Sequence, residues 1–534
     1  MSRARSHWPL YLAALAFALQ TAVLLWLSRR LTDGHLVYAL DDAYIHMAMA
    51  KNLAHHGVWG VTPFGFSSSS SSPLWVVILA AIERGFGGVG LAPLLLNLVS
   101  GLGLLALGHF ALRDFAVSRG QAAAALLALV VFLPMAPLAL VAMEHLLQTA
   151  LALGFAWQIV RQARRPTRSG TAVLLALGFA LAALRYEDLA LALAGAAVLA
   201  FRRRRVDALL LSVAALAAPA AYAALALAHG ETPIPNSLLL KGNLPHAGLS
   251  GLIHLLGYTA CVQLSMNPHM LVLMVGGLFA VGAVRGQKQG RGPVVRTLLF
   301  LCLATTLFQL QFGGFGSFYR YEAYLVALWL LAIAAALPAL VESLGARMRR
   351  GSDVALLACG LALFGVPLAV RFVQATINAP VATRNIYEQQ YQMGRFLARY
   401  YPERGVAVND IGAVDYLAEL RLLDLWGLAN SDVMRARRAK QYGAGEIEEL
   451  ARVHGTEVAV IYADWFDGSG GLPPGWVRVG QWTIADNRIC GGPTVTFFAV
   501  IPGEAPALAA HLREFSSELP ATVAQRGAYL SASN

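Results

Sequence analysis

The sequence Leu40-Asp41-Asp42-Ala43-Tyr44-Ile45 opens a polar stretch that closes at Ser72-Pro73-Leu74-Trp75, with one apolar segment before it and many after it. Two adjacent carboxylates beside a membrane can accept a proton, hold a divalent metal, or stabilise developing positive charge. The residues alone do not choose among these roles. The same pair also fits an interfacial loop whose acids face water.

The surroundings of the acidic pair favour a functional site over a solvated loop. Proton-transfer, aromatic and basic groups share the stretch, and such groups converge where proteins bind or react with substrates. These groups are Tyr44, His46, Lys51, His55, His56 and Trp59.

Composition identifies a membrane protein. Of 534 residues, 57% are hydrophobic and 13% are charged, against roughly 25% charged in soluble proteins. The net charge of +11 comes from short basic clusters between apolar segments, where Lys and Arg set membrane orientation. We therefore exclude nucleic acid as a partner. The four cysteines show no disulfide framework and no metal-ligand spacing.

The basic clusters predict the topology. If all of them face the cytoplasm, each consecutive pair is separated by an even number of crossings. This condition predicts about eleven transmembrane helices, a cytoplasmic N-terminus and a C-terminus on the outer side. The clusters are Arg3 with Arg5, Arg113 with Arg119, Arg161 to Arg168, Arg202 to Arg205, Arg285 to Arg296, and Arg347 to Arg350.

Length decides the segments that the parity rule leaves open. Pro73 to Phe86 is shorter than the roughly 17 residues that a span needs, so we assign it as re-entrant or interfacial. Gly251 to Leu264 is also assigned to the interface. Trp8 to Leu27 is an uncleaved first helix, and the last helix is expected at about Val354 to Val373.

Parity places five polar motifs on one face of the membrane. Ionisable groups at membrane depth are costly and mark sites, and Arg185, Lys241 and Arg320 can together bind a phosphate. Alternatively, Arg185 pairs with Glu187, Lys241 reaches the head groups, and Arg320 anchors the interface. The motifs are Asp41-Asp42, Met143-Glu144-His145, Arg185-Tyr186-Glu187-Asp188, Pro233 to Lys241, and Tyr319-Arg320-Tyr321-Glu322.

The motifs resemble those of the GT-C glycosyltransferases, most closely the bacterial terminal arabinofuranosyltransferase branch. Asp41-Asp42-Ala43-Tyr44-Ile45 resembles the paired acids of that family, and Ser72-Pro73-Leu74-Trp75 resembles its loop exit. Ala142-Met143-Glu144-His145 looks like the family's Gly-Met-Glu-Thr but departs from it at the first and last positions.

Three later motifs extend the resemblance along the chain. Leu184-Arg185-Tyr186-Glu187 is similar to Thr-Arg-Pro-Glu, with tyrosine in place of proline. Ile234-Pro235-Asn236-Ser237, with Lys241 beyond it, resembles a Leu-Pro-Asn-Thr loop and its lysine. Tyr319-Arg320 stands where the family carries a Tyr-Arg pair.

The composition predicts two domains, a transmembrane domain over residues 1–375 with a periplasmic loop at 28–72, and a soluble mixed α/β domain over residues 384–534. Asn409-Asp410-Ile411-Gly412 can shape a ligand loop, but we interpret it as the more common tight strand-to-helix turn. The six serines Ser67 to Ser72 are interpreted as a flexible connector. The expected strands and helix are Val406 to Val408, Val458 to Ile461, Val495 to Ile501 and Glu446 to His454.

The resemblance implies an inverting glycosyltransferase in the inner membrane. It would move a sugar, arabinofuranose in the most similar branch, from a polyprenyl-phosphate donor to a hydroxyl of a cell-envelope glycan, lipid or protein on the periplasmic face. Asp41 would be the general base, and Asp42 would orient the acceptor or, with Asp41, bind a divalent metal such as Mg, Mn or Ca. Arg185, Lys241 and Arg320 would stabilise the departing phosphate.

Seven further residues complete the expected substrate-binding set. They are Tyr44, His55, His56, Glu144, Glu187, Asn236 and Tyr319. The alternative is a transporter or flippase for a lipid-linked or anionic solute, in which the buried charges act as relays. Transporters often show internal repeats and midplane charges, whereas this chain shows no obvious repeat and gathers its charges near one face, which favours the enzyme.

The parity rule makes a topological prediction. A reporter that is active only in the cytoplasm should stay dark when fused after Asn534, because the last crossing delivers the C-terminus outside. The same reporter fused after Arg165 is the control and should be active. A bright C-terminal fusion would overturn the shared face of the five motifs.

Overall fold

The computed structural model describes residues 7–242, 248–287, 289–345 and 351–530. The chain divides into two compact units. The first, the helical unit, comprises Met1–Leu24, Leu94–Ala221 and Gly242–Ile377. The second, the α/β unit, comprises Leu25–Pro93, Tyr222–Lys241 and Asn378–Asn534, so it takes in the predicted loop at 28–72. The predicted basic clusters at Arg3 with Arg5 and at Arg347 to Arg350 lie outside the described residues.

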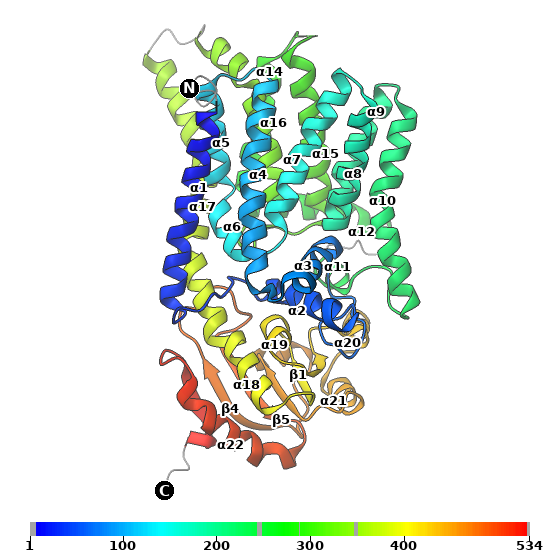
Figure 1. Ribbon diagram of the computed structural model, residues 1–534, viewed down its shortest axis with the longest axis vertical. Helices are drawn as coiled ribbons and strands as arrows, with labels where there is room; N and C mark the ends of the chain where they lie inside the picture. The colour runs from blue at the N-terminus through cyan, green and yellow to red at the C-terminus, as the bar shows by residue number, and fades with distance from the viewer. Residues whose placement is uncertain (1–6, 243–247, 288, 346–350, 531–534) are drawn as a thin grey trace. The chain divides into compact units, whose positions relative to one another are not determined.

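The helical unit is built from apolar helices, most of them long (Figure 1). In chain order these helices are α1 (Trp8–Leu31), α4 (Ala92–Asp114), α5 (Arg119–Phe132), α6 (Met135–Val141), α7 (His145–Arg164), α8 (Arg168–Leu184), α9 (Leu189–Phe201), α10 (Arg205–Ala228), α12 (Leu249–Ile253), α13 (Ala260–Met266), α14 (Pro268–Ala283), α15 (Arg291–Phe312), α16 (Ala323–Gly345) and α17 (Gly351–Ile386).

Six helices in the described part of the chain are long and apolar enough to cross a membrane, or up to eight if each of two bent pairs is one span. With α7, α8 and α9 the count reaches the predicted eleven, although these three helices do not meet the same length and hydropathy test. The count of eleven crossings therefore stays a prediction.

The interfacial position of the two short segments stays a prediction, but their helix boundaries can be compared with it. Helix α3 (Pro73–Phe86) has 14 residues, which is too short for a span. Residues Gly257–Met266 meet α14 at 96°, so this segment does not continue the following helix. The predicted last helix was too short, because α17 continues to Ile386. Polar residues such as Gln374 and Asn378 end the hydropathy signal near Val373 without ending the helix.

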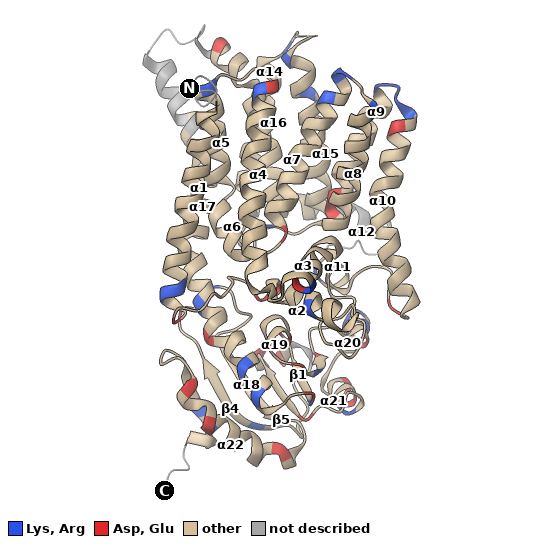
Figure 2. Cartoon of the chain, viewed as in Figure 1, with Lys and Arg blue, Asp and Glu red and all other residues tan. Residues whose placement is uncertain are grey.

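The basic turns of the helical unit share one end of its helices, near the labels α9 and α14 in Figure 2. Helix α7 ends at Arg164 and α8 begins at Arg168, so the Glu144 and Arg185 ends of this helical hairpin lie together at its other end. Helix α15 begins at Arg291, and Arg320 lies in the loop after it. Three of the five polar motifs therefore belong to this unit.

The α/β unit contains a six-stranded mixed sheet with the order β2-β1-β3-β5-β4-β6. Strand β1 is parallel to β2 and β3, while the other pairs are antiparallel. The sequence predicted β1, β3, β5 and α21, and it missed β2, β4 and β6. The strands are β1 (Gly405–Val408), β2 (Arg421–Asp424), β3 (Val458–Ile461), β4 (Val477–Thr483), β5 (Thr494–Ala499) and β6 (Ala524–Gly527).

Helices pack against the sheet through two apolar cores. In one core Phe396, from α18 (Gln392–Tyr400), meets Phe497 of β5 and Phe515 of α22 (Ala505–Phe515) at ring distances of 5.5 and 5.6 Å. The other core joins β1, β2 and β3 to α20 (Ser431–Arg438) and α21 (Ala444–Val453), through residues such as Leu423 and Ile447. Burial of these apolar side chains holds the layers together.

The serine run was wrongly interpreted as a flexible connector. Ser68 is fully buried, its hydroxyl lies 3.0 Å from the Tyr222 hydroxyl, and its carbonyl accepts a hydrogen bond from the Asn236 backbone. The Ser67 hydroxyl accepts a hydrogen bond from the Val61 backbone. Small hydroxyl side chains satisfy backbone groups of a buried loop at little volume, which hydropathy alone does not distinguish from a solvated linker.

Ala142 ends α6 in the left-handed conformation, with φ +59°. The related motif has glycine at this position, and a side chain there costs about 1–2 kcal/mol. Ala142→Gly should therefore leave the thermal midpoint of the detergent-purified protein equal to or above that of the natural chain, because relief of strain offsets the lost buried methyl.

The matched control is Ala139→Gly, which changes a buried alanine inside the same helix. It should lower the thermal midpoint, because a helical glycine costs about 0.5–1 kcal/mol in addition to the lost methyl. Equal destabilisation by the two substitutions would contradict the strained conformation at Ala142.

Candidate functional site

Asp41 begins α2 (Asp41–His56) and is 7% exposed. Its Oδ2 accepts a hydrogen bond from the Gly412 backbone at 2.6 Å, and its Oδ1 accepts one from the Ala413 backbone at 2.7 Å. A Cβ at position 412 would lie 2.0 Å from the Asp41 carbonyl oxygen, so this approach requires glycine. The carboxylate is therefore fixed on the first turn of α19 (Gly412–Leu417).

Asp41 also forms a side-chain hydrogen bond with Asp410, which sits between β1 and α19. Burial raises the pKa of the Asp41 carboxyl well above its usual range, and the neighbouring Asp410 charge raises it further. Burial also raises the pKa of Asp410, which accepts hydrogen bonds from Gln390 and Tyr462. Two buried carboxyl groups in contact share one proton, because both cannot ionise at low cost.

The pair lies at the carboxyl end of β1, whose neighbours β2 and β3 flank it on opposite sides. In α/β sheets, such a switch point is where ligands bind. Here the Asn409 side chain accepts a hydrogen bond from the Tyr462 backbone, and the Asp41 carboxylate fills the first turn of α19. The predicted tight turn at Asn409-Asp410-Ile411-Gly412 is confirmed, but it also holds Asp41, which the sequence did not show.

Asp42 differs from its neighbour in both exposure and partner. Its Oδ1 lies 3.6 Å from Lys241 Nζ, and the two side chains are 27% and 42% exposed. Lys241 ends the short helix α11 (Asn236–Lys241). Asn236 fixes this helix, because its amide donates hydrogen bonds to the Leu428 carbonyl and the Ser431 hydroxyl. Two of the polar motifs thus meet inside the α/β unit.

The other candidates in this unit have packing or surface positions. Tyr44 is buried, and its hydroxyl accepts a hydrogen bond from the Tyr38 backbone at 3.0 Å. His55 Nε2 lies 2.8 Å from Glu83 Oε1. His56 is exposed at the end of α2. These contacts of Tyr44 and His55 do not involve Asp42 or Lys241.

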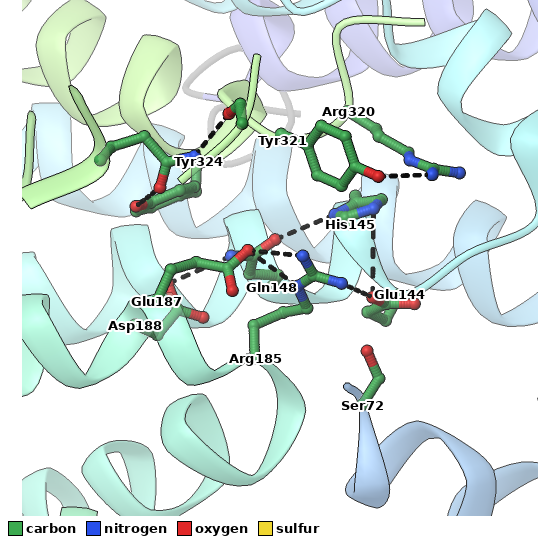
Figure 3. A network of polar contacts seen from close by, with 12 residues as sticks. Ser72, Glu144, His145, Gln148, Arg185, Glu187, Asp188, Arg320, Tyr321 and Tyr324 are labelled. Atoms are coloured by element: carbon green, nitrogen blue, oxygen red, sulfur yellow. Dashed lines mark hydrogen bonds and ion pairs between the residues drawn. The ribbon is translucent and has the colours of Figure 1, made fainter. Parts of the chain in front are cut away.

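In the helical unit, Arg185 bridges two carboxylates (Figure 3). Its guanidinium lies 3.0 Å from Glu144 Oε1 and 2.7 Å from Glu187 Oε1. Glu144 is fully buried, and Arg185 is 6% exposed. The expected alternative that Arg185 pairs with Glu187 is therefore confirmed, and Glu144 joins the same pair.

Three residues that were not selected as site candidates extend this network. Gln148 donates a hydrogen bond to Asp188 Oδ1 at 3.2 Å, and its Oε1 lies 3.1 Å from His145 Nδ1 (Figure 3). All three are buried. Their sequence signal was present, because His145 and Asp188 belong to two of the five polar motifs, and Gln148 lies one helical turn after His145.

Arg320 is buried against Tyr321. Its guanidinium lies 4.7 Å from the Tyr321 ring centroid, while that of Arg185 lies 5.7 Å from the same ring. The Arg320 side chain also donates a hydrogen bond to the Tyr321 hydroxyl at 2.7 Å. Two guanidinium groups therefore share one aromatic ring, an arrangement that cation–π attraction favours.

The loop that carries Arg320 is strained. Ser317, Phe318 and Tyr319 have φ values of +49°, +61° and +60°, and non-glycine residues in this region cost roughly 1–3 kcal/mol each. Tyr319 donates a hydrogen bond to Gln374 of α17. Tyr319 therefore secures the loop, and it does not share the Arg185–Tyr321 contact.

A second buried ion pair lies in the same unit and was missed. Arg371 Nη2 is 3.0 Å from Glu322 Oε1, and its Nη1 donates a hydrogen bond to the Phe132 carbonyl. His269 Nε2 lies 3.6 Å from the same Glu322 oxygen. A lone arginine inside an apolar helix was the available signal for Arg371.

The acidic pair does not fit a metal held by protein ligands. Both Asp41 oxygens already accept backbone hydrogen bonds, and the described residues contain no group of three or more His, Cys, Asp and Glu side chains placed to hold a metal ion. A metal at Asp41 and Asp42 therefore stays a prediction of the sequence motif.

The shared proton of Asp41 and Asp410 predicts a pH dependence. Because both pKa values are higher in the folded chain than in the unfolded chain, folding takes up a proton, and stability falls as pH rises through the raised values. Asp410→Asn should weaken this fall, since asparagine cannot ionise and can still donate to Asp41. The measurement is the thermal midpoint between pH 5 and pH 8. A pKa that differs by one between the folded and unfolded chains changes the free energy of unfolding by about 1.4 kcal/mol.

Asp464→Asn, an exposed carboxyl in the same unit, is the matched control and should keep the natural pH profile. If Asp410→Asn gave the same profile as the natural chain, Asp41 and Asp410 would not share a proton.

Comparisons with known proteins agree with this architecture. A domain family described as a domain of unknown function (DUF8728) matches residues 384–498. Comparison with curated protein sequences found no match. The structure of ArnT from Cupriavidus metallidurans bound to undecaprenyl phosphate is similar with a TM-score of 0.52 and 12% identity, over 91% of this chain and 98% of that one.

Two further structures are similar over most of this chain. The Archaeoglobus fulgidus oligosaccharyltransferase in the apo form has a TM-score of 0.51 and 11% identity, over 93% of this chain and 75% of that one. Mycobacterial arabinofuranosyltransferase AftD has a TM-score of 0.43 and 17% identity, over 91% of this chain and 40% of that one. ArnT and the oligosaccharyltransferase are GT-C proteins. The chain therefore has the fold of the GT-C superfamily.

Proposed function

We propose that the protein is an inverting glycosyltransferase that uses a polyprenyl-phosphate sugar. The observation that carries the proposal is the pair of buried arginines at the Tyr321 ring in a bundle with the GT-C fold. Buried cations in an apolar bundle are costly, and they are retained where an anion is bound. The ArnT structure is described as bound to undecaprenyl phosphate, and we carry this ligand class over to the present chain.

Arg320 is our candidate for the phosphate contact. Its contacts include a tyrosine ring, a tyrosine hydroxyl and the Met143 sulfur at 2.8 Å. Arg185 holds two carboxylates, so its charge is largely compensated, and its guanidinium lies 5.7 Å from the centroid of the same Tyr321 ring. A guanidinium that meets the leaving phosphate stabilises the negative charge that grows in the transition state.

Asp42 is our candidate for the general base. A base needs a carboxylate oxygen that can reach the acceptor hydroxyl. The Asp41 oxygens are buried on two backbone amides, whereas Asp42 is 27% exposed beside Lys241. We therefore exchange the roles that the motif alone implies, with Asp41 as the positioning residue and Asp42 as the base. Lys241 attracts the Asp42 carboxylate and helps to orient it.

The step is a single displacement at the anomeric carbon. The acceptor oxygen forms a bond to that carbon, its proton moves to Asp42, and the bond from the carbon to the phosphate oxygen breaks. The bonding electrons leave with the polyprenyl phosphate. Attack from the face opposite the leaving group inverts the anomeric configuration.

The sugar, acceptor and location are proposals of narrower scope. We propose a cell-envelope glycan, lipid or protein as the acceptor and arabinofuranose as a candidate sugar, on the periplasmic face of the inner membrane. The sequence motifs support the sugar, and the parity of the basic clusters supports the face. Mass spectrometry of envelope glycans from cells with and without the gene would identify the sugar and acceptor together.

The exchange of roles within the acidic pair predicts different defects. Asp42→Asn should lower turnover by roughly 100-fold to 10,000-fold at unchanged stability, because it removes the base. Asp41→Asn should chiefly lower the thermal midpoint. The asparagine NH2 group would face one of the two backbone N–H donors, Gly412 or Ala413, and this hydrogen bond would be lost. The assay is transfer from a synthetic polyprenyl-phosphate sugar by purified protein.

Three outcomes separate the possibilities. If Asp41→Asn stays folded and loses turnover while Asp42→Asn keeps it, Asp41 is the base. If both variants keep turnover, the paired acids have no catalytic role. If the natural protein binds the donor but transfers no sugar to any acceptor supplied, the transporter alternative gains support.

The two arginines should also respond differently. Arg320→Gln should weaken undecaprenyl phosphate binding by about 10-fold to 100-fold, since a charged hydrogen bond is worth roughly 1.5–3 kcal/mol. Arg185→Gln leaves two buried carboxylates without their cation and should cost about 3–5 kcal/mol of stability. Binding is measured by titration of the purified protein, and stability by thermal unfolding.

Arg165→Gln is the control, because Arg165 is exposed at the end of α7. It should change neither quantity. Equal destabilisation by Arg185→Gln and Arg320→Gln, with no separate loss of binding, would assign both arginines a structural role only.

A further inference from the structure

A pocket of about 590 Å³ lies in the α/β unit, apart from Asp42 and Lys241. Trp426 follows β2 and Trp465 follows β3, while the remaining polar side chains come from α20 and the turn after it. Its volume is within the roughly 300–1,000 Å³ typical of small-molecule sites. The side chains that define its chemistry are Trp426, Arg437, Lys440, Gln441, Tyr442 and Trp465.

Two tryptophans form a fixed corner of this pocket. The Trp426 and Trp465 rings lie 4.7 Å apart at an interplanar angle of 61°. Arg437 stacks 3.7 Å from the Trp426 ring centroid and donates a hydrogen bond to the Trp426 carbonyl. The aromatic surface is therefore held in place before any ligand arrives, which lowers the entropic cost of binding.

Trp465 is held equally firmly from the other side. Its indole N–H donates a hydrogen bond to the Gly491 carbonyl at 3.1 Å. A Cβ on Gly491 would lie only 2.2 Å from the Trp465 ring, so glycine is needed for this packing. Both rings remain partly exposed, so part of this rigid aromatic surface stays accessible to a ligand.

The pocket carries positive charge. Its described lining includes Arg437 and Lys440 but no Asp or Glu, and within the described residues neither cation has a carboxylate at ion-pair distance. Lys440 is exposed and adopts a left-handed backbone with φ +58°. Burial lowers the pKa of Arg437, a cost that a bound anion would offset.

We propose that this pocket binds a saccharide that bears an anionic group. The exposed parts of the two tryptophan rings pack against the C–H groups of a sugar ring, Arg437 and Lys440 meet its carboxylate or phosphate, and Gln441 meets its hydroxyls. A flat nucleobase prefers two parallel faces, whereas rings at 61° form a corner that suits a puckered ring. This binding does not depend on the proposed transfer reaction.

Calorimetric titration of the purified full-length protein tests the proposal. Trigalacturonate supplies the carboxylate form, glucose 6-phosphate the phosphate form, and maltotriose a neutral oligosaccharide of matched length. We expect one or both anionic probes to bind at least tenfold more tightly than maltotriose. No binding of either anionic probe, or equal binding of maltotriose, would overturn the proposal.

Matched variants locate the binding. Lys440→Gln should weaken binding of the anionic probe severalfold. Arg438→Gln should leave this binding unchanged, because Arg438 is exposed next to the pocket without lining it. Trp465→Ala should abolish binding, and the lysine variant keeps the test valid if this substitution prevents folding. Asp42→Asn should bind normally, which separates this site from the proposed base.

Two results would count against the pocket or its ligand class. Equal effects of Lys440→Gln and Arg438→Gln would show a general charge effect instead of a site. Tighter binding of adenosine monophosphate than of either anionic saccharide would assign the tryptophan corner to nucleotides.

Discussion

The contact between the Asp41 carboxylate and the backbone amides of Gly412 and Ala413 connects two segments that lie about 370 residues apart in the chain. At the carboxyl end of β1, where β2 and β3 lie on opposite sides, the Asp41 carboxylate occupies the position in which such sheets often bind a ligand. The start of α2 is thereby fixed, and Asp42 follows it directly. Gly412 is part of the same constraint, because any side chain there would collide with Asp41.

The paired acids, the buried strands β1, β3 and β5, and the polar motifs were recognisable because each depends on local composition or on a contiguous pattern. Partners distant in sequence were not. Asp410 was interpreted as a turn residue, since nothing near it in the chain announces Asp41. The serine run was misjudged for the same reason, because Tyr222 and Asn236, which make it a buried loop, lie more than 150 residues away.

The two ionic clusters of the helical unit differ in how their charges are balanced. Arg371 pairs with Glu322 and Arg185 pairs with both Glu144 and Glu187, so these arginines are compensated within the protein. Such pairs contribute little net stability, because the cost of desolvation offsets their attraction. Removal of one partner is nevertheless strongly destabilising, because it leaves an uncompensated buried charge. Their value is geometric. Arg185 holds its guanidinium near the Tyr321 ring, and the strained loop at Ser317 to Tyr319 delivers Arg320 to the same ring.

Adjacent residues on a helix point about 100° apart, and this fact separates two acids that look equivalent in the sequence. At the start of α2, one direction leads to the first turn of α19 and the other to Lys241. The Asp41 side chain is buried, accepts two backbone hydrogen bonds and contacts the Asp410 carboxyl group. This environment fixes the position of the side chain and favours a shared proton. The Asp42 side chain is partly exposed and lies beside the Lys241 ammonium group. With the role that we propose for Asp42, the paired acids would act as one anchor and one base, and the anchor would fix the position of the base.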